Sequence, residues 1–196
     1  MKKIIAILSI LAMTAAMASC SGKPGGSTAD NADAQDAPLT DSLPGSAEND
    51  ETAAPAAGGQ LDFSTADIDG NAFTDDDLKD AKVVMVNFWE PWCGPCVGEI
   101  GDLARLYEEY KEQGFLIVGV YSTDGMDDDV RTVIEKNGVT YPIIRSGGNM
   151  SEFMTAYVPT TVFADGSGRI ISSEPEIGAH SYDEWKNIIE NYLAQT

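Results

Sequence analysis

The chain has 196 residues, of which 32 are Asp or Glu and 12 are Lys or Arg, giving a formal charge of −20. A surface this acidic repels nucleic-acid phosphates and anionic lipid headgroups, which argues against a nucleic-acid binder or a polybasic membrane protein. With three Cys and one His, the chain lacks the ligands of an ordinary zinc cluster unless carboxylates complete it, whereas its 43% hydrophobic content is enough for one core.

Residues 1–19 have the parts of a bacterial lipoprotein signal peptide. Two lysines precede an apolar run of about 14 residues, shorter than the roughly 20 that a transmembrane helix needs. The run ends in Met-Ala-Ser-Cys, which resembles a lipobox, the motif whose cysteine becomes the lipidated first residue. We therefore expect export from the cytoplasm and anchoring to the bacterial cell membrane through lipid on Cys20. An ordinary signal peptide with an incidental cysteine is the alternative.

Residues 20–60 are predicted to form a disordered tether. They consist mainly of small and polar residues, and such a segment buries too little apolar surface to offset the entropy of ordering. A flexible chain of this length spans on the order of 35 Å. We place the folded domain at residues 61–196, which hold 25 acidic and nine basic residues. This domain is expected to stand off an anionic membrane and to prefer neutral or basic partners.

The first half of the folded domain alternates buried strands with an amphipathic helix, which predicts an α/β fold. Residues 82–89 and 115–121 are continuous apolar, β-branched runs of the kind found in central strands. Between them, apolar side chains recur at three- and four-residue spacing over 97–110. These segments predict a β–α–β unit with parallel strands.

The second half continues the alternation. A helix ended by Gly138 is predicted over 127–137, followed by a strand over 141–144 and a short helix over 151–157. A hairpin and a last helix complete the pattern, with strands at 160–164 and 169–173, a helix cap at Ser181 and an apolar stripe of Trp185, Ile188, Ile189, Tyr192 and Leu193.

The sequence Cys93-Gly94-Pro95-Cys96 lies where the first long strand ends and the first helix begins. Unpaired N–H groups and the helix dipole at a helix start stabilise a thiolate and lower its pKa from about 8.5. Cys93 is therefore the expected exposed nucleophile, and Cys96 can close a small disulfide ring with it. Pro95 presets the backbone of the first helical turn.

Two acidic neighbours affect the expected pKa of Cys93, and two other interpretations of the cysteine pair compete with redox chemistry. Glu90 and Glu99 flank the motif, so the pKa of Cys93 is expected to fall only moderately, as in a reductant. Half a zinc site would need more soft ligands, and only His180 remains. A structural disulfide suits an exported protein, but a two-residue spacer closes too small a loop to constrain the unfolded chain much. Redox chemistry is therefore favoured.

The surroundings of the motif are specific as well: Asn87-Phe88-Trp89, Trp92, the Cys-Gly-Pro-Cys turn, Glu99, Leu103, Leu106, Tyr107 and Tyr110. This pattern resembles the thioredoxin-like TlpA/ResA family of membrane-tethered thiol-disulfide oxidoreductases, over about residues 61–196. The resemblance implies a thioredoxin fold, a mixed central sheet flanked by helices, with the family's extra helix and strand after the second long strand. It implies that Cys93 attacks a substrate disulfide, that Cys96 resolves the mixed disulfide, and that this redox-active pair needs no further cofactor.

Other roles follow from the same resemblance. Val158-Pro159 resembles the family's cis-proline loop, which faces the cysteines and pairs with the substrate backbone, so we expect a cis peptide bond there. Glu99 matches an acid that the family keeps near its thiols. It is either a proton-transfer group for Cys96 or a solvated acid favoured by the helix dipole. The expected substrate-binding residues are Trp92, Gly94, Pro95, Val158 and Pro159.

The chain departs from the family's pattern at Glu90-Pro91, at Asn87 and at Gly101, which stands where a proline is usual. Glu90-Pro91 replaces the usual Ala or Gly, which is expected to make the rim of the site more negative. Asn87 stands where thioredoxins proper carry a buried Asp, so Glu99 becomes the leading candidate for proton transfer.

The sequence therefore predicts an exported, lipid-anchored reductase of protein disulfides, supplied by a transmembrane electron donor because its compartment is oxidising. By resemblance, its tasks are cytochrome c maturation, general disulfide reduction or supply of a methionine sulfoxide reductase. A peroxiredoxin-like peroxidase is an alternative, although Glu90 stands where a peroxidatic site normally has Thr. Another is a non-catalytic lipoprotein that binds a partner on a thioredoxin scaffold.

Overall fold

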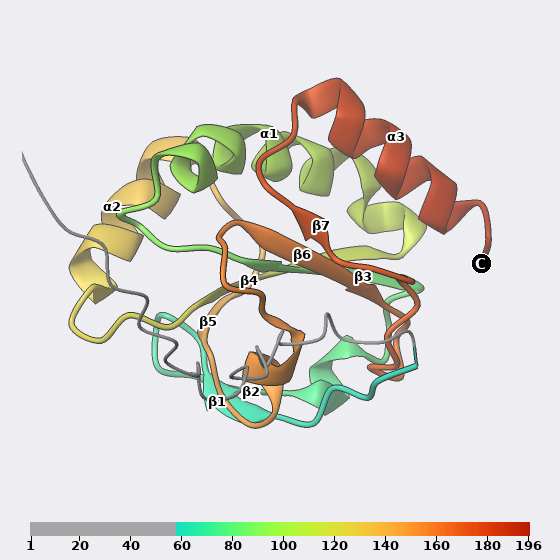
Figure 1. Cartoon of the computed structure of the whole chain (residues 1–196), viewed down its shortest axis with the longest axis horizontal. Coiled ribbons are helices and arrows are strands. Elements are labelled where there is room, and N and C mark those ends of the chain that lie inside the picture. The colour runs from blue at the N-terminus through green and yellow to red at the C-terminus, as the bar shows by residue number, and fades with distance from the viewer. Residues whose placement is uncertain (1–57) are drawn as a thin grey trace, which may run out of the picture. The chain divides into compact units, whose positions relative to one another are not determined.

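The computed structural model describes residues 58–196 (Figure 1). The predicted signal peptide, Cys20 and residues 21–57 of the predicted tether lie outside the described residues. Within the described part, no helix combines the length and the apolar character needed to cross a bilayer.

A five-stranded mixed sheet lies at the centre of this part, in the order β5-β4-β3-β6-β7. Its strands are β3 (Val83–Phe88), β4 (Phe115–Tyr121), β5 (Ile143–Arg145), β6 (Thr160–Ala164) and β7 (Glu176–Ile177). The α-helices are α1 (Gly94–Tyr110), α2 (Asp127–Asn137) and α3 (Tyr182–Leu193), and the short 3-10 helices are η1 (Asp75–Leu78), η2 (Lys111–Gln113) and η3 (Met150–Phe153). A separate antiparallel pair consists of β1 (Ser64–Ala66) and β2 (Ala72–Thr74).

The central strand is β3, because its side chains are buried on both faces of the sheet. It runs parallel to β4, with Val86 opposite Val118, and antiparallel to β6, with Val86 opposite Val162. The predicted parallel β–α–β unit is therefore confirmed. After β4 come α2 and β5, the helix and strand expected as the family's insertion, and β5 lies parallel to β4 at one edge of the sheet.

Successive side chains of β3 enter two hydrophobic clusters on opposite faces of the sheet. Met85 belongs to the cluster that includes Trp185 of α3 and several residues of α1. Figure 1 shows α1 and α3 together on this side. Val86 belongs to the second cluster, which includes Leu61 and Phe63 from the start of the described chain. Both faces of the sheet are thus covered by hydrophobic clusters. The chain returns to the surface in the turn that follows β3.

Local signals located most helix ends correctly. The helix predicted over 127–137 is α2, and Gly138 after it has φ +65°, the left-handed conformation that commonly ends a helix. The cap predicted at Ser181 precedes α3. The predicted helix over 151–157 is wrong in length, because only η3 forms. The hydroxyl of Thr155 there accepts the amide of Tyr157, and such side-chain bonds compete with a continuing helix.

The strand predicted over 169–173 is also wrong, because this segment makes only isolated bridges. The carbonyl of Phe163 accepts hydrogen bonds from the amides of both Ile171 and Ser172. Two residues thus oppose one, as in a β-bulge, and the bulge interrupts the ladder. Regular pairing with β6 resumes only at β7.

Candidate active site

A tight turn carries the chain from β3 into α1. The amide of Cys93 donates to the carbonyl of Glu90 at 3.0 Å, which closes a four-residue turn with Pro91 in its second position. Proline favours that position because its fixed φ suits the turn. Trp92 lies at the third position and is 61% exposed, whereas Cys93 is the N-cap of α1.

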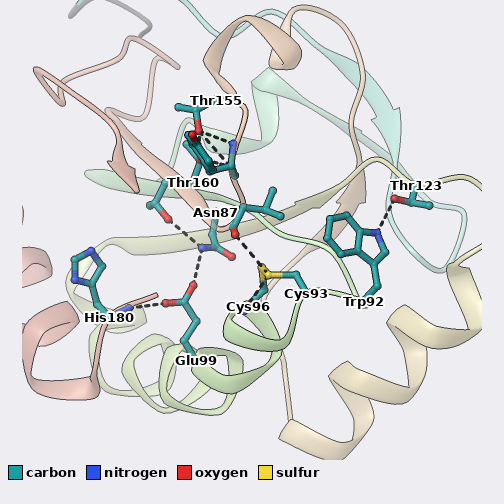
Figure 2. The surroundings of a disulfide bond; sticks show 12 residues. Asn87, Trp92, Cys93, Cys96, Glu99, Thr123, Thr155, Thr160 and His180 are labelled. Carbon is teal, nitrogen blue, oxygen red and sulfur yellow. Dashed lines mark hydrogen bonds between the residues drawn. A yellow bond between two sulfur atoms is a disulfide. The ribbon is translucent and has the colours of Figure 1, made fainter. Parts of the chain in front are cut away.

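Cys93 and Cys96 are joined by a disulfide (Figure 2). Cys93 Sγ also accepts the amide of Cys96 at 3.2 Å, so the sulfur occupies the position of a helix-capping acceptor. Because the start of a helix favours negative charge, this arrangement would stabilise a Cys93 thiolate once the disulfide is reduced. The prediction of an exposed Cys93 is wrong, since only 6% of the residue is exposed. Cys93 is still the more accessible of the two cysteines, because Cys96 is fully buried.

The loop before β6 explains why Cys93 is covered. The carbonyl oxygen of Val158 lies 3.6 Å from Cys93 Sγ, and the Val158–Pro159 peptide bond is cis, as predicted. The hydroxyl of Thr160 donates to the carbonyl of Tyr157 at 2.6 Å, which holds the loop on its other side. The loop therefore places a backbone acceptor directly beside the first sulfur.

The remaining predicted substrate-binding residues lie on the turn itself. Trp92, Gly94 and Pro95 are all exposed next to the disulfide. The side chain of Tyr157, 69% exposed, adds a second aromatic group beside Val158 that the sequence analysis did not single out. The disulfide is thus bordered by exposed aromatic and backbone groups from two segments of the chain.

Glu99 lies one helical turn beyond Cys96 and is only 2% exposed, so the alternative of a solvated acid is wrong. Its Oε1 accepts the side-chain amide of Asn87 at 3.3 Å. Its Oε2 accepts the backbone amide of His180 at 3.0 Å and the indole N–H of Trp185 at 2.8 Å. In Figure 2 the carboxylate points toward Asn87 and His180.

Burial raises the pKa of the Glu99 carboxyl above its ordinary value of 4.5, and the hydrogen bonds from Trp185, His180 and Asn87 oppose this shift. Glu99 therefore holds a proton to higher pH than a surface glutamate does. None of the hydrogen bonds within residues 58–196 joins Glu99 to a sulfur, so proton exchange with Cys96 needs an intervening group.

Sequence reasoning missed most of the hydrogen-bond partners of Glu99 and of Asn87, which bonds to it. Trp185 was expected only in an apolar stripe, and His180 was considered only as a metal ligand. Thr161, whose hydroxyl accepts the Asn87 amide at 2.9 Å, was not singled out. One signal was available, because the N–H of a buried tryptophan usually finds an acceptor.

Glu90 does not face the rim of the site. Only 3% of the residue is exposed, and its Oε1 accepts the amide of Ser122 at 2.8 Å, the hydroxyl of Ser122 at 2.6 Å and the amide of Thr123 at 3.2 Å. The expectation that Glu90 makes the rim more negative is therefore wrong. The carboxylate is instead turned into the loop after β4, where polar N–H and O–H groups surround it.

Comparisons with known proteins agree with this site. Residues 57–173 match the AhpC/TSA family. The chain is 35% identical over 136 residues to the thiol-disulfide oxidoreductase ResA of Oceanobacillus iheyensis, covering 68% of this chain and 67% of that protein. It is 37% identical over 105 residues to the thiol:disulfide interchange protein HelX of Rhodobacter capsulatus, covering 51% of this chain and 56% of that protein.

Solved structures show the same fold. A thioredoxin-family thiol:disulfide interchange protein from Chlorobium tepidum superposes with a TM-score of 0.59 at 24% identity, over 72% of this chain and 99% of that one. A thiol:disulfide interchange protein from Bacteroides sp. superposes with a TM-score of 0.58 at 25% identity, over 71% of this chain and 91% of that one. The predicted thioredoxin fold is therefore confirmed.

Proposed function

Since the chain belongs to the AhpC/TSA family and, within it, to the TlpA/ResA-like thiol-disulfide oxidoreductases of the thioredoxin family, we propose that it is an exported reductase of protein disulfides. One observation carries the proposal. Cys93 caps α1 with its sulfur, accepts the amide of Cys96 at 3.2 Å and is paired with Cys96 in a disulfide. This position stabilises the thiolate that disulfide exchange requires.

In the proposed reaction, the Cys93 thiolate attacks one sulfur of a substrate disulfide and forms a mixed disulfide. The other substrate sulfur leaves as a thiolate. The Cys96 thiolate then attacks the sulfur of Cys93, which releases the second substrate thiolate and closes the Cys93–Cys96 disulfide. Two electrons pass to the substrate, and a transmembrane electron donor returns the pair to the dithiol. Besides this donor and the substrate, the cycle uses only the Cys93–Cys96 pair.

Glu99 is the group that we assign to the proton of Cys96. Its buried carboxyl lies one helical turn away and has a raised pKa, so it can take up a proton at a pH where a surface glutamate remains charged. An intervening water or side chain has to complete the path.

Trp92, Gly94, Pro95, Val158 and Pro159 are proposed to bind the substrate. The Val158 carbonyl beside Cys93 Sγ supports this assignment, because an extended substrate segment that delivers a disulfide to Cys93 can donate an amide to it. The exposed indole of Trp92, next to Cys93 in the chain, adds apolar contact area.

The proposed setting is the outer face of a bacterial membrane. Residues 1–19 are the signal peptide in this proposal, Cys20 carries the lipid and residues 20–57 form the tether. Residues 58–60, predicted as the end of the tether, instead pair with residues 168–170 and belong with the catalytic domain at 61–196. Cytochrome c maturation, or electron supply to an exported reductase, is the task that we assign from the resemblance to the TlpA/ResA family.

Insulin reduction by the dithiol form tests the proposal. The wild-type protein is expected to reduce insulin disulfides with dithiothreitol as electron source, and Cys93→Ser is expected to abolish this activity. Cys96→Ala should accumulate a mixed disulfide through Cys93, which mass spectrometry of the trapped adduct would identify. Peroxide consumption without a disulfide substrate would favour the peroxidase alternative, and a cellular role that survives Cys93→Ser would favour the non-catalytic one.

A further inference from the structure

Glu90 is a buried carboxylate for which the proposed reaction has no use. Within residues 58–196 it forms no ion pair, and only 3% of it is exposed. A buried carboxylate is costly unless hydrogen bonds compensate for the lost water. Here Oε1 receives three of them, from two groups of Ser122 and one of Thr123, and Oε2 lies 3.4 Å from the Thr123 amide. The carboxylate thus holds residues 122–123 against the turn that carries Cys93.

The same loop also holds the most exposed side chain of the turn. The indole N–H of Trp92 donates to the hydroxyl of Thr123 at 3.2 Å, as Figure 2 shows. The backbone of Trp92 is set by the turn from Glu90 to Cys93, in which the Cys93 amide donates to the Glu90 carbonyl. Glu90 therefore influences Trp92 in two ways. Its backbone carbonyl closes the turn that sets the Trp92 backbone, and its carboxylate holds Thr123, which bonds to the Trp92 indole.

Nothing else in the described contacts of Trp92 fixes the direction of its ring by a hydrogen bond. An indole that is 61% exposed samples several rotamers unless it is tied, and ordering such a side chain on binding costs affinity. A pre-ordered indole spares the complex that cost. Glu90 thus contributes to substrate binding although its own side chain is out of reach of solvent.

We propose that Glu90 is a positioning residue which, through Thr123, holds the Trp92 indole in the orientation that binds protein substrates. The inference rests on the proposed function, because it assigns Trp92 to the surface that substrates contact. It predicts discrimination by size: a protein disulfide that covers Trp92 depends on Glu90, whereas a small disulfide that touches only the sulfurs does not.

Three variants separate the effect of the hydrogen bonds around Glu90 from the effect of its charge. Glu90→Ala removes the acceptor for the loop. Glu90→Gln keeps one oxygen for the three donors that bond to Oε1, removes the charge and replaces Oε2 by an NH2 group. Thr123→Val is nearly isosteric, leaves the backbone bonds to Glu90 in place and removes only the acceptor of the Trp92 indole, so it tests the link if Glu90→Ala does not fold. Glu112→Ala removes an exposed acid elsewhere and serves as the charge control.

Two measurements give the result. The ¹H–¹⁵N heteronuclear NOE of the Trp92 indole, assigned with Trp92→Phe, is expected to fall in Glu90→Ala and Thr123→Val and to stay at the wild-type value in Glu90→Gln and Glu112→Ala. In the same two variants, KM for insulin is expected to rise about two- to tenfold. Their kcat for insulin and their kcat/KM for 2-hydroxyethyl disulfide should change less than about twofold, since the reacting sulfurs are untouched.

The opposite results overturn the inference. An indole NOE that does not change in Thr123→Val and Glu90→Ala would show that Trp92 is held by other contacts. Equal losses in Glu90→Gln and Glu90→Ala would assign the effect to charge, and equal losses on insulin and 2-hydroxyethyl disulfide would assign it to the sulfur chemistry. A wild-type protein that fails to reduce insulin would overturn the proposed function. The NOE is measured without substrate, so it would still show whether Glu90 holds the Trp92 indole through Thr123.

Discussion

At the scale of single residues, the two glutamates beside the cysteine motif have separate surroundings. Glu90 lies in a loop of N–H and O–H donors, and Glu99 lies between α1, β3 and the start of α3. Neither is a surface acid, so neither presents its carboxylate directly to a substrate. For Glu99, burial gives the stability of the folded state a definite pH dependence.

The pH dependence of stability tests the burial of Glu99. Because its pKa in the folded protein is raised above 4.5, the folded state binds the Glu99 proton more tightly than the unfolded state does. The contribution of Glu99 to stability is then fully present below pH 4.5 and is lost as the pH rises through the raised value. We expect the free energy of unfolding of the wild type, relative to that of Glu99→Gln, to fall as the pH increases.

Urea unfolding of both oxidised proteins between about pH 4 and pH 8 measures this difference. The comparison cancels the titration of groups that do not interact with Glu99. A difference that stays flat or grows with pH would mean that Glu99 is not desolvated in the folded protein.

At the scale of elements, the catalytic helix α1 and the last helix α3 meet at Glu99. The amide of His180 and the indole of Trp185 both reach it, one just before the cap of α3 and one in its first turns. Tyr110 near the end of α1 donates to Glu190 of α3 at 2.6 Å, a second link between the same helices. The start of α1, where the cysteines lie, is therefore braced by an element about 80 residues away in the chain.

Replacement of Trp185 by Phe tests this brace. Trp185→Phe leaves Glu99 without its shortest hydrogen bond, and we expect a loss of about 1 to 3 kcal/mol beyond the loss of packing. Trp89→Phe is the matched control, because Trp89 is equally buried and its indole N–H has no partner within residues 58–196. Urea unfolding of both variants gives the comparison. Equal destabilisation would contradict a stabilising role for the bond between Trp185 and Glu99.

Trp185→Phe is also expected to shift the pH dependence of stability. The indole hydrogen bond lowers the pKa of Glu99 against the effect of burial, so its removal should move the Glu99-dependent loss of stability to higher pH.

At the scale of the whole molecule, residues 61–196 carry a formal charge of −16. Most of the ion pairs in the described part are solvent-exposed, such as that of Lys186 with Glu109 at 2.6 Å, and pairs of this kind contribute little to stability. The excess charge acts mainly on approaching molecules, through a field that salt screens.

Small disulfides of opposite charge test this field. The kcat/KM for the cationic disulfide cystamine is expected to fall, and that for the anionic oxidised glutathione to rise, as ionic strength increases from about 0.01 M to 0.15 M. Neutral 2-hydroxyethyl disulfide should show little change and serves as the control. The same direction of change for both charged substrates would contradict steering by the acidic domain.

Patterns that are local in the chain were predictable. The apolar run over 82–89 became β3, and the helix over 127–137 has the predicted bounds, because side-chain periodicity and a terminal glycine act within a few residues. The hairpin strand over 169–173 was not predictable, because the bulge opposite Phe163 depends on how two strands align. The pairing of β1 with β2 was missed although it is local, because strands of three residues are too short to show a clear alternation.

The sequence by itself determined the chemistry of the site, two cysteines at a strand-to-helix junction, and its resemblance to the TlpA/ResA family implied the cis-proline loop later in the chain. Only the tertiary structure decided the surroundings of the two glutamates and the accessibility of Cys93. Trp185 lies 86 residues from Glu99, and Ser122 lies 32 residues from Glu90. Whether an acid is solvated or buried depends on which distant segments pack over it, and the spacing of residues along the chain does not contain that information.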